Sequence, residues 1–114
     1  MSETTIEVGR DFSPTPGGRY VANGASSGEE FRERLLAPAL RNNDKVVVFL
    51  DGTAGYAGSF LEEAFGGLVR ACRFSLDELH AKLFIRIKNH QYEIYRRMAE
   101  QYIAEAAGGS NRVA

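Results

Sequence analysis

The clearest hydrophobic pattern in the chain is the unbroken apolar run Lys45–Leu50 (KVVVFL), which has polar turn residues on both sides. A short β-branched run of this kind is typical of a strand that is buried on both faces. Alternating patterns over Thr4–Val8 and Lys82–Ile87 predict two more strands, and the charged residues of the second suit a sheet edge. Arg19–Val21 predicts a fourth, short strand that would pair with the first as a hairpin.

Three main helices are predicted from apolar residues at helical spacing. The first follows the capping box Ser27–Glu30, in which the serine oxygen accepts an early helix N–H and the glutamate reaches back. Its outward face is charged and includes Arg32, and we expect Pro38 to bend or break it. A second capping box, Ser59–Glu62, opens the next helix, and the last helix covers Gln91–Ala107.

The order of the predicted elements is β-β-α-β-α-β-α. Strands separated by helices imply right-handed crossovers and helices packed against a sheet. We therefore expect an α/β fold with a mixed sheet of about four strands and helices packed on it. The chain has 114 residues and no long linker, which predicts a single domain over residues 1–114 with frayed ends at 1–3 and 108–114.

Composition narrows the class of protein. Hydrophobic residues make up 44% of the chain and charged residues 25%, which excludes global disorder. The formal net charge of −1 gives no concentrated basic surface, so we expect no nucleic-acid or membrane partner. The single cysteine, Cys72, and the absence of an apolar leader or spanning segment predict a soluble, cytoplasmic protein.

Candidate chemistry concentrates in the glycine-rich loop Gly52–Gly58, which lies between a buried strand and a helix, the geometry that binds anions. The loop matches neither the P-loop nor the dinucleotide pattern, and no lysine or arginine lies between Asp51 and Leu68. Asp51 itself is typical of a turn or cap. Without a nucleophile–base pair, a metal signature or a cofactor motif, we expect no enzyme activity, metal or cofactor. A small-molecule or nucleotide-binding module that uses this loop is the alternative function.

The glycine pair Gly66–Gly67 within the second predicted helix is the least expected local feature. Each glycine costs a helix about 1 kcal/mol relative to alanine, so the pair needs a physical reason. One interpretation is the close approach of a partner's backbone across this helix. The other is close packing within the domain or an end of the helix at this point.

Four segments of the sequence resemble a known family. They are Phe12–Ser13, Pro16–Tyr20, Ser27–Glu33 and Ser59–Leu68. Together with the order of elements, they resemble the STAS-like family DUF4325 of uncharacterised bacterial proteins, which is related in fold to anti-sigma factor antagonists. The resemblance extends from about Asp11 to Ala107.

This resemblance implies a regulatory protein-interaction domain. In anti-sigma factor antagonists, the loop before the second helix and the first turns of that helix dock onto a GHKL-type ATPase or kinase. That partner can phosphorylate a serine at the helix start, and the serine at this place is Ser59. Here it lies between Gly58 and Phe60 and not in an Asp-Ser-Ser-Gly context. A plain N-cap role for Ser59 is the alternative.

The resemblance also implies which residues contact the partner. The expected partner-binding residues are Gly55, Tyr56, Gly58, Ser59, Phe60, Glu62, Glu63, Gly66 and Gly67. A homodimer is a further hypothesis, of a purely structural kind.

Overall fold

A computed structural model describes residues 2–108, and its strands form one parallel sheet. The strands are β1 (Glu3–Glu7), β2 (Lys45–Phe49) and β3 (Leu83–Arg86), in the spatial order β1-β2-β3. Residues Thr5, Val47 and Phe84 lie in one register row. Three of the four predicted strands are therefore confirmed, and β3 lies at an edge as its charge pattern indicated.

The predicted strand Arg19–Val21 is wrong, and the sheet of the described residues is parallel and not mixed. The 3₁₀ turn η2 (Val21–Asn23) occupies this place. The Tyr20 N–H donates to the Asn23 side-chain oxygen at 3.0 Å, and the Asn23 N–H donates to the Tyr20 carbonyl at 2.8 Å. Because this local turn uses the backbone groups that a hairpin needs, the segment cannot join the sheet.

The first predicted helix is continuous and is built from α1 (Gly28–Phe31), the π-helical segment η3 (Arg32–Leu36) and α2 (Ala37–Asn42). The Ser27 hydroxyl caps it by accepting the Glu30 N–H at 3.0 Å, as predicted. In the π-turn, the Ala37 N–H reaches the Arg32 carbonyl, one residue farther back than in an α-helix. This wide turn comes directly before Pro38, which lacks an N–H, so the helix continues through the proline without a break.

The second and last predicted helices are present, and the structure adds a short helix between them. The second helix consists of α3 (Gly58–Leu61), the π-helical segment η4 (Glu62–Gly66) and α4 (Gly67–Arg70). The short helix α5 (Leu76–Lys82) begins at a complete capping box formed by Ser75 and Glu78. The final helix α6 (Glu93–Ala106) follows the 3₁₀ turn η5 (His90–Tyr92), and a π-helical turn η1 (Val8–Phe12) follows β1.

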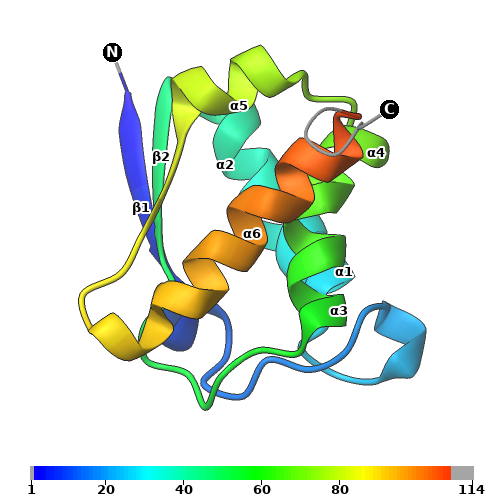
Figure 1. Ribbon diagram of the computed structural model, residues 1–114, viewed down its shortest axis with the longest axis vertical. Coiled ribbons are helices and arrows are strands. Elements are labelled where there is room, and N and C mark those ends of the chain that lie inside the picture. The colour runs from blue at the N-terminus through cyan, green and yellow to red at the C-terminus, as the bar shows by residue number, and fades with distance from the viewer. Residues whose placement is uncertain (1, 109–114) are drawn as a thin grey trace.

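Helices cover one face of the sheet and leave the other open (Figure 1). Ile6, Val48 and Ile85 on the inner face are buried in the core. On the outer face, Val47 and Phe49 are only half-buried. The prediction that β2 is buried on both faces is therefore wrong, because no helix of the described residues packs on its outer side.

The amino end of the described chain is tied to the sheet. The Ser2 N–H donates to the Asp44 carboxylate at 3.0 Å, and Glu3 already belongs to β1. Gly108 at the other end donates its N–H to the Glu105 carbonyl at 2.9 Å, and residues 1 and 109–114 lie outside the described residues. The fraying of residues 1–3 and 108–114 stays a prediction. No helix within residues 2–108 is both long and apolar enough to span a membrane.

Candidate protein-contact site

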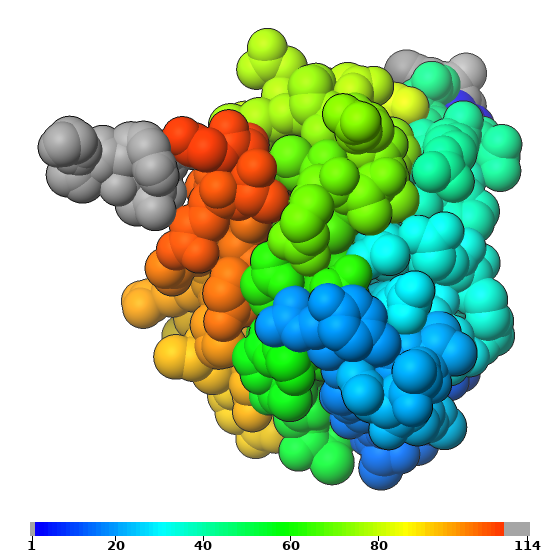
Figure 2. All heavy atoms as spheres, turned by 90° about the vertical axis from the view of Figure 1, so that its right-hand side faces the viewer, coloured from blue at the N-terminus to red at the C-terminus, as the bar shows by residue number. Residues whose placement is uncertain are grey.

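The helix Gly58–Arg70 lies between the helix Gly28–Asn42 and α6, and only one stripe of it reaches the surface (Figure 2). Its inner face consists of apolar side chains at helical spacing, and Leu61, Phe65 and Leu68 are fully buried in the core. Its first turn packs on α6, since a Cβ at Gly58 would lie 3.3 Å from the Tyr102 hydroxyl. Most of the surface of this helix is therefore packed against other elements of the domain.

Ser59 does not cap this helix, so the predicted capping box Ser59–Glu62 is wrong. The N-cap is Ala57, whose carbonyl accepts the Phe60 N–H at 3.1 Å. Ser59 lies inside the first turn and is half-buried. Because its neighbour Gly58 can begin the helix, the cap moves two residues earlier than the sequence pattern indicates. Phosphorylation of Ser59 stays a prediction.

Glu62 and Glu63 bind arginines from three separate segments. The Glu62 carboxylate accepts hydrogen bonds from Arg19, in the loop after β1, and from Arg70 at 2.7 Å. Glu63 is 6% exposed and accepts from Arg32 Nη1 at 2.7 Å, which also donates to the Glu63 main-chain carbonyl at 2.7 Å. The two acids thus join the loop, the first helix and the second helix into one ion-pair cluster.

The arginines set the protonation state of Glu62. Partial burial alone would raise the pKa of this carboxyl, but the hydrogen bonds from Arg70 and Arg19 outweigh burial and lower the pKa below its ordinary value. Burial likewise opposes the charge on Arg32, yet its bonds to Glu63 and Glu33 raise the pKa of the guanidinium. Both groups are charged at neutral pH, and Arg32, predicted to face outward, is 4% exposed.

Gly66 and Gly67 are buried, and their lack of a side chain makes room inside the domain. A Cβ at Gly67 would lie 2.2 Å from Arg32 Nη1, and one at Gly66 would lie 2.9 Å from a Glu62 carboxylate oxygen. The helix does not end at the pair. Of the two interpretations of this glycine pair, the structure therefore supports close packing within the domain, and a partner could reach these glycines only by displacing Arg32 or α6.

Tyr56 and Phe60 also lie in the core. Phe60 is fully buried, and the Tyr56 hydroxyl donates to the Leu50 carbonyl at 2.6 Å. The Tyr56 ring lies 5.6 Å from Phe60 and 5.1 Å from Tyr95, measured between ring centroids. Burial raises the pKa of the Tyr56 hydroxyl well above its ordinary value. These aromatic residues anchor the start of the helix and do not face solvent.

The glycine loop is held from within. Gly55 has a φ of +112° and lies where a Cβ would be 2.9 Å from the Tyr95 hydroxyl. The amides of Ala54 and Gly55 already donate, to the Pro14 carbonyl at 2.8 Å and to the Thr53 hydroxyl at 3.2 Å. These two amides are therefore not available to cradle a phosphate.

Asp51 acts as a loop-tying residue, as its position indicated. Its carboxylate accepts the backbone N–H groups of Lys88 and Asn89, at 2.9 and 2.8 Å for the shortest contacts. These bonds join the ends of β2 and β3. Both oxygens are engaged in holding the backbone, which is the structural role of a turn aspartate.

Sequence reasoning missed the exposed apolar residues of the Arg19–Asn23 loop. Tyr20 is 47% exposed and Val21 is 58% exposed. The loop lies across the second helix in Figure 2, as the blue segment over the green one, and Arg19 ties it to Glu62. The sequence carried no clear signal for this exposure, because so short an apolar run is also consistent with a strand and single exposed apolar residues are common on protein surfaces.

The structure therefore divides the predicted partner-binding residues into two groups. Tyr56, Phe60, Glu63, Gly66 and Gly67 are buried, whereas Gly55, Gly58, Ser59 and Glu62 keep part of their surface accessible. The exposed loop residues Tyr20 and Val21 join the second group at the same helix. A docking role for this region stays a prediction, now limited to the accessible side chains.

A family model described as a STAS-like domain of unknown function (DUF4325) matches residues 27–89. The match covers more than half of the 114 residues, from the cap of the first helix to the loop after β3. No curated protein and no solved structure matches the chain.

Proposed function

Because the chain belongs to the STAS-like family DUF4325, we propose that it is a regulatory protein-interaction domain and not an enzyme. Its contact surface is the loop–helix face, which we define as Arg19, Tyr20, Val21, Ser59, Glu62 and Arg70. This face combines the exposed stripe of the second helix with the Arg19–Asn23 loop that crosses it (Figure 2).

The observation that carries the proposal is the fixed presentation of two large apolar side chains to solvent. The Val21 N–H donates to the Glu29 carboxylate at 2.9 Å, and the Asn23 side chain closes the turn behind Tyr20. Arg19 then pins the loop to Glu62. A loop that is already ordered loses little conformational entropy when a partner binds, and tyrosine and arginine are the side chains most often found at the energetic centre of interfaces.

The partner that the resemblance suggests is a GHKL-type ATPase or kinase. Phosphorylation of Ser59 by that partner is part of this proposal. A phosphate on Ser59 would lie one helical turn from Glu62. It would add negative charge close to the place where Arg19 and Arg70 bind Glu62. The modification would therefore alter the ion pairs of Arg19 and Arg70 at the surface where the partner binds.

The test is affinity purification of the tagged chain from its native cells, followed by mass spectrometry of the bound proteins and of Ser59. We expect recovery of a GHKL-type ATPase by the wild-type chain and by Ile94→Asp, whose target is another exposed apolar residue, 57% exposed, on α6. We expect Val21→Asp to lose it. Equal recovery by both variants, or recovery of the tagged chain alone, would contradict the proposal.

One observation favours the alternative of a small-molecule module. A hollow of about 230 Å³ lies beside the glycine loop at the carboxyl ends of the strands, where open α/β sheets bind ligands. Its lining is Thr53, Ala54, Gly55, Gln91, Tyr92 and Tyr95. A ligand at 100 times its dissociation constant adds about 2.7 kcal/mol of stability, so thermal shifts with ATP, GTP and common anions discriminate the two functions.

A further inference from the structure

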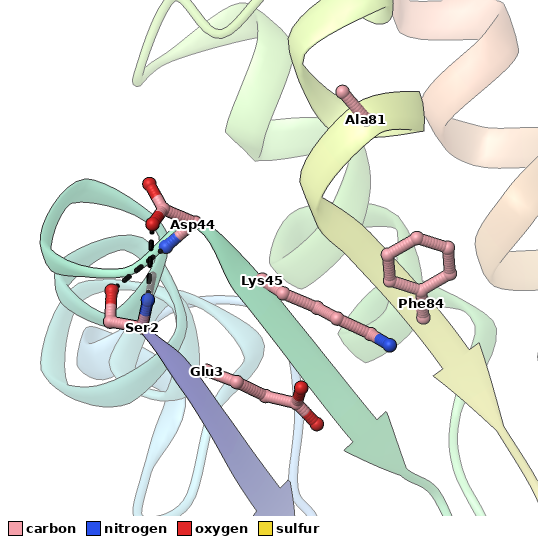
Figure 3. Close-up of a pocket in the computed structure, with 6 residues that line it drawn as sticks. All are labelled: Ser2, Glu3, Asp44, Lys45, Ala81 and Phe84. Carbon is pink, nitrogen blue, oxygen red and sulfur yellow. Dashed lines mark hydrogen bonds between the residues drawn. The ribbon is translucent and has the colours of Figure 1, made fainter.

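The outer face of the sheet is an unusual surface for a parallel sheet. Such sheets almost always have both faces covered, because their strands carry apolar side chains on each side. Here the half-buried Val47, Phe49 and Phe84 form an apolar strip across β2 and β3, and no helix within residues 2–108 lies above it. A hollow of about 440 Å³ opens at the amino end of this face, where Figure 3 shows Lys45 extending toward the Phe84 ring.

Cations cover the aromatic rings of this strip. Lys45 Nζ lies 5.1 Å and the Arg86 guanidinium carbon 5.1 Å from the centre of the Phe84 ring. Lys88 Nζ lies 4.8 Å from the centre of the Phe49 ring. Among the described residues, no carboxylate oxygen lies within 4.0 Å of the Arg86 guanidinium. The Arg86 guanidinium is therefore able to form an ion pair with a carboxylate of a partner.

The backbone positions of the outward charges differ between the two edges of this face. The outward residues of β1 are Glu3, Thr5 and Glu7, whereas Arg86 ends β3 and Lys88 follows it, with the Lys88 ammonium reaching across Phe49 to 3.8 Å from Glu7. Glu7, Phe49 and Arg86 form one register row across the sheet. Among the described residues, the cations that the Glu7 carboxylate contacts are the exposed Arg10 at 3.3 Å and Lys88 at 3.8 Å, and exposed ion pairs of this kind can be exchanged for others at little cost in free energy.

We propose that this face is the contact between two copies of the chain, related by a two-fold axis that runs parallel to the strands. Such an axis places β1 of one copy over β3 of the other and keeps each register row opposite itself. Glu7 of each copy then meets Arg86 of the other, Val47 and Phe49 of β2 meet their own copies at the centre, and Phe84 lies over Thr5. The Lys88 side chains, which lie over the Phe49 rings in the single chain, move aside when this contact forms. A two-fold axis perpendicular to the strands would instead set β1 over β1, acid against acid.

The size of the face sets the strength of this dimer. Three strands of about five residues span roughly 15 Å by 17 Å, which is less than the about 800 Å² per partner of a standard interface. We therefore expect a dissociation constant between about 1 µM and 1 mM, and a dimer that responds strongly to concentration. The face lies on the sheet side of the molecule, separate from the loop–helix face, so both contacts can form at once.

Sedimentation velocity of the full chain over this concentration range tests the proposal. We expect the wild type to form dimers and both Glu7→Lys and Arg86→Glu to be monomers, because each variant faces like charge with like charge in both symmetric contacts. An equimolar mixture of the two variants restores opposite charges at both contacts and forms a heterodimer. Arg97→Glu, an exposed charge reversal on α6, is the control and dimerises like the wild type.

We expect Glu7→Lys and Arg86→Glu to remain folded, because both side chains lie at the surface. Circular dichroism checks that each variant is folded. A monomeric wild type at the highest concentration overturns the proposal. So does dimerisation of the single variants, which would place the contact on another face, or a mixture of folded variants that stays monomeric. None of these results bears on partner binding at the loop–helix face.

Discussion

The Arg19–Asn23 loop exposes apolar side chains, whereas the first and second helices beside it bury charged ones. Tyr20 and Val21 face solvent, while Arg32 and Glu63 are 4% and 6% exposed beneath the adjoining helices. The loop satisfies its polar backbone groups locally, through Asn23 and Glu29, and so needs no place in the core. The buried charges are satisfied by each other. In this molecule, the hydrogen-bond and ion-pair partners available to a side chain determine whether it is buried as much as its hydrophobicity does.

This difference separates two parts of the molecule: the structural frame, which is formed by the packed helices Gly28–Asn42 and Gly58–Arg70, and the loop at its surface. The ion pair between Arg32 and Glu63, and the glycines that make room for it, hold the second helix against the first. The loop is fastened to the outside of that frame by Arg19. Changes to the frame should therefore reduce stability, and changes at the loop should reduce binding.

The largest effect is expected for Arg32→Met. This substitution leaves the buried Glu63 carboxylate without its closest cation, and breaking a buried pair costs about 3–5 kcal/mol. Arg19 and Arg70 still lie 3.4 and 3.2 Å from Glu63, so the lower end of that range is expected. Urea denaturation measures the loss in the free energy of unfolding.

The matched variant is Arg32→Met combined with Glu63→Met, which removes both charges. We expect it to recover most of the lost stability, because two apolar side chains of similar size replace the pair. If the single and double variants are equally destabilised, the pair is not what holds the helices together.

The next largest effect is expected for Gly67→Ala. Its methyl group would lie 2.2 Å from Arg32 Nη1 and must displace the guanidinium from Glu63. The disturbed ion pair costs about 3 kcal/mol, offset by about 1 kcal/mol of improved helix propensity, which leaves a net loss of about 2 kcal/mol. Gly18→Ala is the control, since its nearest heavy atom would be 3.8 Å away. A Gly67→Ala variant as stable as the wild type would show that Arg32 moves freely.

A smaller effect is expected from acid titration of Glu62. The pKa of this carboxyl is lower in the folded chain than its ordinary value of 4.5, so its stabilising contribution is present above that value and is lost as pH falls through the folded pKa. Glu62→Gln should cost about 1 kcal/mol at neutral pH, a charge-assisted bond discounted for partial exposure. Denaturation across this pH range should show the two proteins converging in acid; a constant difference would contradict the assignment.

The smallest effect on stability is expected for Val21→Ala at the loop. The side chain is 58% exposed and buries little apolar surface, so the free energy of unfolding should change by less than about 0.5 kcal/mol. Thermal denaturation measures it. A loss of more than about 1 kcal/mol would mean that Val21 belongs to the frame.

How much of the fold can be predicted from the sequence depends on how far apart in the sequence the interacting residues lie. The strand Lys45–Phe49 and the helix α6 were predictable because each has a clear apolar pattern within its own segment. Arg19–Val21 was not, because three alternating residues carry too little signal against the turn closed by Asn23. The burial of Arg32 depends on Glu63, 31 residues away, and no local pattern reports such a pairing. The open face of the sheet depends on which side every helix packs, which strand patterns do not specify.

The same limit applies to the candidate site. The second helix and its loop were located from the sequence, but the pattern could not show that Phe60 and Gly67 face inward. The capping box at Ser59 looked complete, yet the backbone begins the helix at Gly58. The exposure of Tyr20 and Val21, which carries the proposed contact face, is visible only in the structure, where the loop lies over the helix.

The most direct test of the loop–helix face is calorimetric titration of the recovered partner into the wild type, Tyr20→Ala and Ile94→Ala. The account predicts that Tyr20→Ala weakens binding by about 30-fold or more, the loss of one central interface residue, while Ile94→Ala binds like the wild type. Equal affinities for all three proteins would contradict the claim that the partner binds at this face.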